Sequence, residues 1–269
     1  MTAPATTSAP APARSWAAWL TTDVAARYTA RLLMLVVWQA IGVLSTRIPT
    51  PVGTIEFLID EMMRGEFWPH LTWTLRRAAI SLSVVLVLGI AIGWAMGRWW
   101  RVGAYFRDVV TIMLALPAFI WALLSAMWWG FSEVGPFVVP VLAATPMLVA
   151  STYEGAKSLP QPLIAMSTAY RVPKVRFFGW LVLPAMSPYI FAGFRYAVLA
   201  GWGALSLVEF FASNWGAGYR AAFWYDAGNF NGLMGWGLVE IVVILAVDRL
   251  VLERLARRSR RWQEGTERW

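Results

Sequence analysis

The sequence predicts an all-α, polytopic membrane protein with about six transmembrane helices. Of its 269 residues, 59% are hydrophobic and only 14% are charged, whereas soluble domains usually carry about a quarter charged residues. The chain also contains 18 Trp residues, a side chain that favours the two membrane–water interfaces. Several apolar runs approach the roughly 20 residues that a spanning helix needs. The bilayer is therefore the expected solvent.

Six apolar runs are the expected spans: residues 30–45, 78–96, 109–129, 136–152, 182–211 and 233–252. The first run is short for a span. The fifth is longer than a crossing requires, and we expect it to bend at Gly201 or Gly203. Around these spans, residues 1–28 are expected to form a disordered or interfacial tail, 29–256 the membrane domain and 257–269 a basic cytoplasmic tail.

The distribution of Lys and Arg predicts the orientation of the chain. Basic residues crowd the segments that would be inside if the N-terminus is cytoplasmic, and they are sparse in the others. By the positive-inside rule, both termini are expected in the cytoplasm. Arg76 and Arg77 are exceptions at an outside end, where they are expected to snorkel to the interface or to face protein.

Two connections are longer than simple turns. The outside segment 46–74 contains an amphipathic stretch, 54–63, which is expected to lie on the membrane surface. The inside segment 153–181 is basic, and Pro160 and Pro173 divide it into two short helices joined by a tight turn. Such a pair of helices suits docking into a groove on a soluble partner.

Catalytic chemistry has little support in the sequence. There is no Cys and only one His, which argues against thiolate and His-based metal sites and against Cys nucleophiles. No Gly-rich phosphate-binding motif of the G-x-x-x-x-G-K-[ST] type occurs. We therefore expect no catalytic residue and no cofactor. The basic residues flank apolar runs instead of forming one patch, so membrane lipid is an expected partner and nucleic acid is not.

Several short motifs occur in a characteristic order. They are Thr152-Tyr153-Glu154-Gly155, Leu181-Val182-Leu183-Pro184, Pro188-Tyr189-Ile190, Gly193-Phe194-Arg195, Glu209 and Gly216-Ala217-Gly218-Tyr219. In this order and spacing, the chain resembles the transmembrane permeases of ATP-binding-cassette (ABC) importers. The resemblance is specifically to the binding-protein-dependent nitrate/sulfonate/taurine branch, and it covers roughly residues 32–261.

The resemblance implies a type I ABC importer permease fold in a bacterial inner membrane. The expected partners are two ABC ATPase subunits, a second permease subunit, and a periplasmic or lipid-anchored substrate-binding protein. The second permease makes either a homodimer or a heterodimer. ATPase activity would belong to the partner, so this chain is not expected to be an enzyme. It would move a small solute, of the sulfonate, taurine or nitrate type, by alternating access.

The same resemblance assigns segment 153–181 as the ATPase-coupling loop. Its expected coupling residues are Glu154, Gly155, Ala165, Met166, Ser167, Arg171, Lys174, Leu183 and Pro184. The chain departs from the family pattern here, because the E-A-A triplet falls on residues 165–167 and the turn glycine falls on Arg171. We therefore expect a different turn, such as one set by Pro173.

Four residues are candidates for the transport pathway or its gates: Arg195, Glu209, Pro117 and Pro146. A charge in a span faces protein or water, so Arg195 is equally open to a structural ion pair, for which Glu209 of an opposite protomer is one partner. The two prolines are expected to kink their helices, and Glu154 to be an interfacial anchor. The alternative function is a self-contained secondary transporter or channel, which would need ion-coupling carboxylates and no docking loop.

Overall fold

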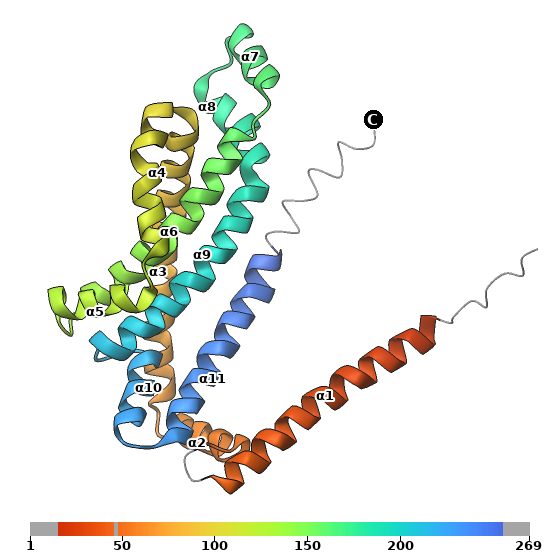
Figure 1. The fold of residues 1–269 in the computed structure, drawn as a ribbon, viewed down its shortest axis with the longest axis vertical. Coiled ribbons are helices and arrows are strands. Elements are labelled where there is room, and N and C mark those ends of the chain that lie inside the picture. The colour runs from red at the N-terminus through yellow and green to blue at the C-terminus, as the bar shows by residue number, and fades with distance from the viewer. Residues whose placement is uncertain (1–15, 46–47, 255–269) are drawn as a thin grey trace, which may run out of the picture. The chain divides into compact units, whose positions relative to one another are not determined.

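The structure, a computed structural model, describes residues 16–45 and 48–254, and every element in these ranges is a helix (Figure 1). The elements are α1 (Trp16–Leu44), α2 (Pro51–Met63), α3 (Phe67–Arg98), α4 (Trp100–Ala115), α5 (Ala118–Trp129), α6 (Val134–Lys157), α7 (Gln161–Ala169), α8 (Lys174–Phe177), the π-helical turn η1 (Phe178–Val182), α9 (Leu183–Ala212), α10 (Ala217–Asp226), α11 (Phe230–Val247) and the π-helical turn η2 (Asp248–Leu252). The all-α prediction is confirmed. Of the expected tail 1–28, residues 1–15 lie outside the described residues and residues 16–28 belong to α1, while all of the expected tail 257–269 lies outside them.

The chain divides into two units, Met1–Gly53 and Thr54–Trp269. In the first unit, α1 begins at Trp16, upstream of the predicted first span. The segment that follows α1 packs back on it, since Trp38 Nε1 donates to the carbonyl oxygen of Pro49 at 2.8 Å. Close contact between Gly42 and Thr50 leaves no room there for a side chain.

The core of the second unit is the packing of α6 between α3 and α9. Glycines one turn apart on α3 face α6, and a Cβ added at Gly89 would lie 2.5 Å from Leu148, while one at Gly93 would lie 2.6 Å from Thr152. On the α9 side, a Cβ at Gly155 would lie 2.8 Å from Tyr189. Small residues let helix backbones approach closely in membranes, where dispersion contacts drive association. These three helices therefore form a tightly packed layer.

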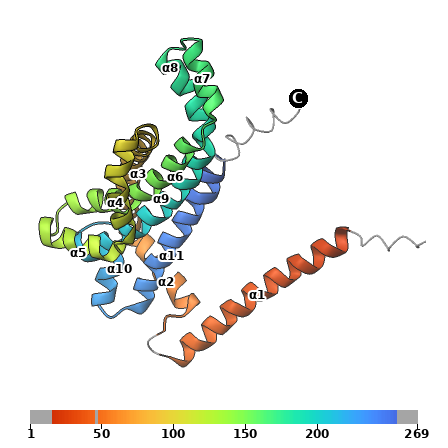
Figure 2. The same ribbon diagram turned by 45° about the horizontal axis from the view of Figure 1, so that its top comes forward.

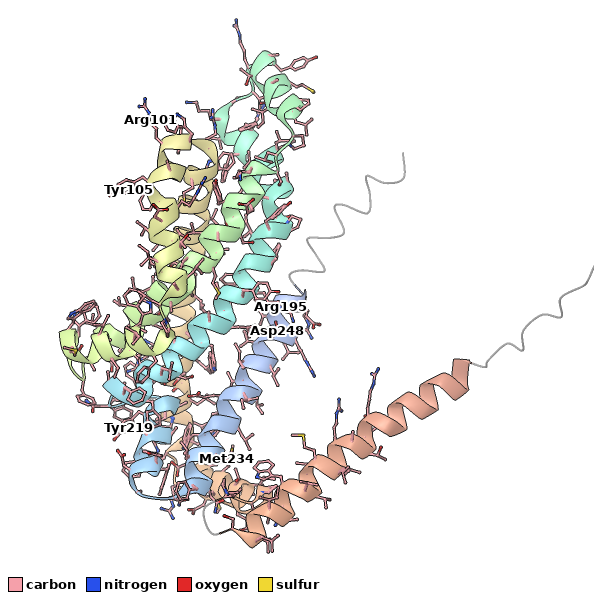
Figure 3. The ribbon with its side chains drawn as sticks, in the orientation of Figure 1. Arg101, Tyr105, Arg195, Tyr219, Met234 and Asp248 are labelled. Atoms are coloured by element: carbon pink, nitrogen blue, oxygen red, sulfur yellow. The ribbon has the colours of Figure 1, made fainter. Side chains whose placement is uncertain are left out.

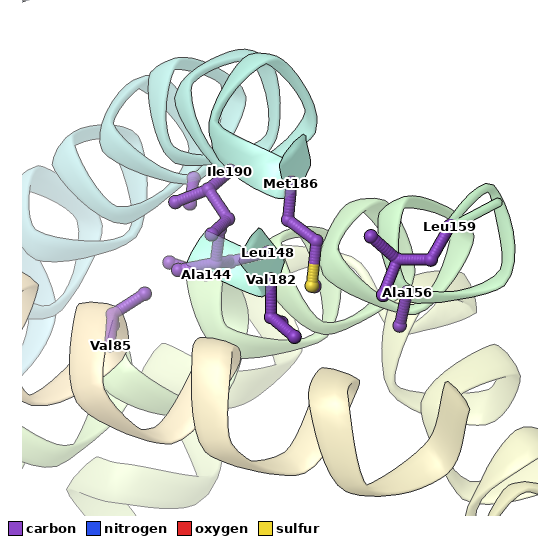
Figure 4. Close-up of a cluster of buried hydrophobic side chains, with 9 residues drawn as sticks. Val85, Ala144, Leu148, Ala156, Leu159, Val182, Met186 and Ile190 are labelled. Carbon is purple, nitrogen blue, oxygen red and sulfur yellow. The ribbon is translucent and has the colours of Figure 1, made fainter. Parts of the chain in front are cut away.

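A buried apolar cluster fills the space between these helices at one end (Figure 4). Val85 comes from α3, Leu148 from α6 and Met186 from α9, and Val182 of η1 is fully buried with them. The turn η1 thus enters the core before α9 begins, which fixes the start of α9 on the bundle.

Five described helices are long and apolar enough to cross a membrane, or six if the bent pair α4–α5 counts as one span. The prediction of about six spans is therefore confirmed, but the third predicted span, 109–129, is wrong as a single helix. The axes of α4 and α5 differ by 93°. Leu116 is extended, with ψ 121°, and Pro117 caps α5. Proline disfavours the helical conformation at the residue before it and lacks an N–H, and here Leu116 is extended, so Pro117 breaks the span instead of kinking it.

The helix α9 is continuous through Gly201 and Gly203, so the fifth span is unbroken there, and its expected bend stays a prediction. One further expectation is corrected. The helix α6 continues to Lys157, which places Glu154 and Gly155 in a helix and not in the loop.

The helix α2 contains the amphipathic stretch expected on the membrane surface. Its apolar residues Ile55, Ile59 and Met62 are exposed. On its opposite side, the buried Glu61 carboxylate accepts hydrogen bonds from Arg220 of α10. The helix is therefore anchored to the bundle by an ion pair and still presents an apolar face.

Candidate functional site

The two ends of the second unit carry different features (Figures 1 and 2). We call the end with α7 and α8 the loop end, and the opposite end, with α10 and the start of α3, the α10 end. Arg101, at the start of α4, lies at the loop end, and Tyr219 lies at the α10 end (Figure 3).

The loop end presents the two short helices that the sequence predicts. Pro160 caps α7 in an extended conformation, with ψ 118°, and Pro173 does the same for α8, with ψ 137°. Each proline lacks an N–H and disfavours helix at the residue before it, so it separates the preceding helix from the next, whose N-cap position it occupies. The segment therefore projects as a helix–turn–helix from the end of α6.

Arg171 occupies the left-handed position of the turn between α7 and α8. Its φ is +50°, the only positive φ at a non-glycine among the described residues. The Arg171 N–H donates to Thr168 O, and the Val172 N–H donates to Ser167 O, both at 3.0 Å. These bonds form a Schellman motif, which satisfies the last carbonyls of α7 and requires a left-handed residue where Arg171 stands. The expectation of a different turn is thus wrong, since Arg171 adopts the glycine's conformation.

One side of this loop is anchored and the other is exposed. Leu159 is buried in the core cluster, and Ile164 and Phe177 pack against it. Met166 is 57% exposed and Val175 is 85% exposed. Of the other expected coupling residues, Ser167 is half-buried, and those with exposed side chains are Ala165, Arg171, Lys174, Leu183 and Pro184. The arrangement is an anchored surface loop with apolar side chains available to a partner.

Glu154 and Gly155 lie on α6, just before this loop. Glu154 is exposed and lies 3.8 Å from Lys157, one turn along the helix. Gly155 is buried against Tyr189 of α9. The pair therefore joins the loop to the core instead of forming part of its exposed face.

The α10 end is built around Arg77 of α3, whose side chain is 0% exposed. Its Nη1 donates to Glu209 Oε1 at 2.8 Å and to the carbonyl oxygen of Trp215 at 2.6 Å. Its Nη2 donates to both oxygens of Glu133, at 2.6 and 2.7 Å. One guanidinium thereby links α3, α9, the start of α6 and the segment after α9. A buried charge needs such partners to offset its desolvation.

Further groups of α3 bind the backbone of the segment between α9 and α10. The Thr74 hydroxyl donates to Glu209 Oε2 at 2.7 Å and accepts from the Ala217 N–H, also at 2.7 Å. The Gly216 N–H donates to His70 Nδ1 at 3.1 Å, and the Gly218 N–H to Glu209 Oε2 at 3.1 Å. We call His70, Thr74, Arg77, Glu133 and Glu209 the α10-end clamp.

Glycine is needed at one position beside the clamp. Gly216 has φ +117°, and a Cβ there would collide with the Glu209 carboxylate. Only glycine adopts such a conformation readily and allows so close an approach. The backbone of the Gly-x-Gly-Tyr motif thus covers the buried Glu209 carboxylate.

Arg195 and Glu209 do not meet in this chain. The partner of Arg195 is Asp248, which accepts from Nε and Nη2 at 2.7 Å each (Figure 3), and the partner of Glu209 is Arg77. Glu209 is fully buried, so the pairing of the two across a protomer interface is wrong. The Arg195 side chain is 51% exposed and that of Asp248 is 14% exposed.

The two candidate prolines differ in their surroundings. Pro146 is buried inside the continuous helix α6, whereas Pro117 lies at the break between α4 and α5. The structure therefore places the four pathway candidates in four different settings and does not bring them together in one site.

Comparison with known proteins identifies the family. Residues 86–263 match the family described as "Binding-protein-dependent transport system inner membrane component". The taurine transport system permease protein TauC of Escherichia coli strain K12 is 25% identical over 241 residues, covering 86% of each chain. The putative aliphatic sulfonates transport permease protein SsuC of the same strain is 30% identical over 195 residues, covering 70% of this chain and 73% of the relative.

A bicarbonate system and a solved structure extend the comparison. The bicarbonate transport system permease protein CmpB of Synechococcus elongatus is 26% identical over 245 residues, covering 85% of each chain. A chain of the MetNI methionine ABC transporter, in an inward-facing conformation, superposes with a TM-score of 0.58 at 15% identity. That match covers 69% of this chain and 92% of the other, and it supports the fold alone.

Proposed function

Because the chain belongs to the inner-membrane permeases of binding-protein-dependent ABC importers, in the nitrate/sulfonate/taurine branch, we propose that it imports a small anionic solute by alternating access. It is a multi-pass membrane subunit and not an enzyme, and the ATPase is a separate subunit. Permeases of this family work with an ATPase and a substrate-binding protein. The anionic class is supported by relatives named for taurine, sulfonates and bicarbonate.

The observation that carries the proposal is the projecting helix–turn–helix at the loop end. Its apolar anchors fix it to the core, while Met166 and Val175 remain exposed. Exposed apolar side chains on short helices are the features of helix-in-groove docking. We infer that two ATPase subunits receive these loops from two permeases, with homodimer and heterodimer both open, and that both termini and the loop end face the cytoplasm.

We propose that the four pathway candidates shape the pathway or its gates by positioning helices. Arg195 and Glu209 each have an ion-pair partner within the chain, and Pro117 and Pro146 shape helices. None of the four is therefore proposed as a direct solute ligand. In this account ATP closes the ATPase dimer and the coupling loops move with it. The ATPase dimer binds the two conformations of the permease with different affinity, and this difference supplies the driving free energy.

Uptake into proteoliposomes tests the proposal. Taurine, an alkanesulfonate, nitrate and bicarbonate would be offered with the chain alone, and with the chain plus its ATPase and binding protein. ATP-dependent uptake of at least one anion by the full system is expected. Uptake by the chain alone would instead establish the self-contained carrier.

Deletion of residues 160–180 tests the docking assignment. The expected result is membrane insertion without co-purification of the ATPase, because both exposed helices are removed. As a matched control, Arg101→Ala changes an exposed residue at the same end but outside the loop (Figure 3) and should retain the ATPase. Retention of the ATPase by the deletion variant would refute the assignment.

A further inference from the structure

The helix α11 is held differently along its length. In its half nearer the α10 end, Trp236 and Val239 are buried, and Val243 packs in the same cluster. Toward the loop end, Leu245, Leu250 and Val251 are exposed. In that second half, Leu252 is buried and Asp248 forms the ion pair with Arg195. This half is therefore attached to the bundle by apolar contacts, such as that of Ile244 with the cluster that contains Leu205 of α9, and by one ion pair with α9.

The geometry of that pair is specific. Both bonds are 2.7 Å and run from Nε and Nη2 to the two different carboxylate oxygens. A bidentate guanidinium–carboxylate pair fixes the relative orientation of the two side chains as well as their distance, and it is stronger than a neutral hydrogen bond. An apolar contact at this place would hold the helices together without fixing their angle.

Both residues of the ion pair lie on helices that adjoin or contain a π-helical turn. Asp248 is the first residue of η2, and α9 begins directly after η1, which connects it to the coupling loop. Single π-helical turns inside α-helices are often found at functional sites. Arg195 lies about 15 Å past Pro184 along α9. The pair thus joins the last span to the helix that continues from the loop.

We propose that the Arg195–Asp248 ion pair makes α11 follow α9 when the coupling loop moves, so that Asp248 is a positioning residue for transport. This inference rests on the proposed function. The pair transmits displacement and does not contact the solute. Its loss should separate ATP hydrolysis from transport, because the loop still engages the ATPase while the last span no longer follows.

The transport test uses the complete complex with four variants. Asp248→Asn and Arg195→Met each remove one charge, the double variant Arg195→Asp/Asp248→Arg exchanges the charges, and Arg249→Met is the control. Arg249 is an exposed neighbour of Asp248. Each single variant should lower uptake about tenfold while ATP hydrolysis changes less than about twofold, a coupling loss typical of linked sites. The exchange should restore most of the uptake, and the control should match the original protein.

A distance measurement tests, without transport, whether the ion pair holds α11 against α9. The chain has no Cys, so spin labels can be placed at Leu199→Cys and Leu250→Cys, both exposed positions. The distance distribution in the full chain should be narrow, broad in Asp248→Asn, and narrow again after the charge exchange.

The inference is overturned if the single variants keep the original ratio of uptake to hydrolysis, if the exchange restores neither readout, or if the label distances do not change. Failure of the original complex to take up any solute counts against the proposed function, while the label distances still decide the inference.

Discussion

The α10 end and the loop end are stabilised in opposite ways. At the α10 end, buried side chains of α3 bind both a carboxylate and the backbone of a neighbouring segment. At the loop end, apolar anchors such as Leu159 hold an exposed loop. A fully paired buried network permits one arrangement, whereas exposed contacts permit several. The difference indicates a fixed α10 end and a loop end that yields to a partner.

Removal of the Arg77 charge should lower the free energy of unfolding more than any other change considered for the two ends. Arg77→Met leaves the Glu209 carboxylate buried without its cation, which typically costs about 3–5 kcal/mol in the free energy of unfolding. Thermal or denaturant unfolding in detergent measures the change. Arg76→Met is the matched control, because Arg76 is exposed and lies over the Trp73 ring at 4.6 Å, a contact worth about 0.5–1 kcal/mol.

The double variant Arg77→Met/Glu209→Gln sharpens the same prediction. It removes both charges, so it should recover part of the stability that Arg77→Met loses. A single variant as stable as the Arg76 control would show that the α10 end is not held by this network.

Substitution of Arg171 should give the smallest effect. A left-handed non-glycine residue costs roughly 1–2 kcal/mol, but glycine also loses more entropy on folding. Arg171→Gly should therefore raise the free energy of unfolding by less than about 1 kcal/mol. Arg171→Val should lower it, because a β-branched residue is unfavourable at positive φ. Hydrogen exchange at Val172, whose N–H closes the turn, measures the local effect, and equal protection in the two variants would contradict it.

The lengths of the apolar runs predicted the spans, and the positions of Pro160 and Pro173 predicted the two-helix loop. Spans and loop could be predicted because each depends on local sequence. Proline alone did not predict where a helix breaks. Pro146 remains inside α6, which packs on α3 and α9, whereas Pro117 stands among mostly exposed residues and ends a helix. Tertiary packing holds the first helix together despite its proline, and such packing is not visible in a single run of sequence.

The ion-pair partners could not be predicted for a related reason. Arg77 and Glu209 are 132 positions apart, and Arg195 and Asp248 are 53 apart, so no local spacing connects them. One signal was available, since Arg77 violated the charge bias at an end expected outside, which left snorkelling to the interface or a protein-facing position as its two explanations. Thr74 and His70 carried no such signal, because their role depends on the backbone of residues 216–217.

Distances within each end, measured in the complex with and without an ATP analogue, test the central claim most directly. One pair of spin labels, Trp68→Cys and Asp226→Cys, lies on exposed positions at the α10 end, and another, Arg101→Cys and Thr168→Cys, lies on exposed positions at the loop end and outside the proposed coupling residues. The account predicts that nucleotide changes the loop-end distance and leaves the α10-end distance unchanged. A change confined to the α10 end, with a constant loop-end distance, would contradict it.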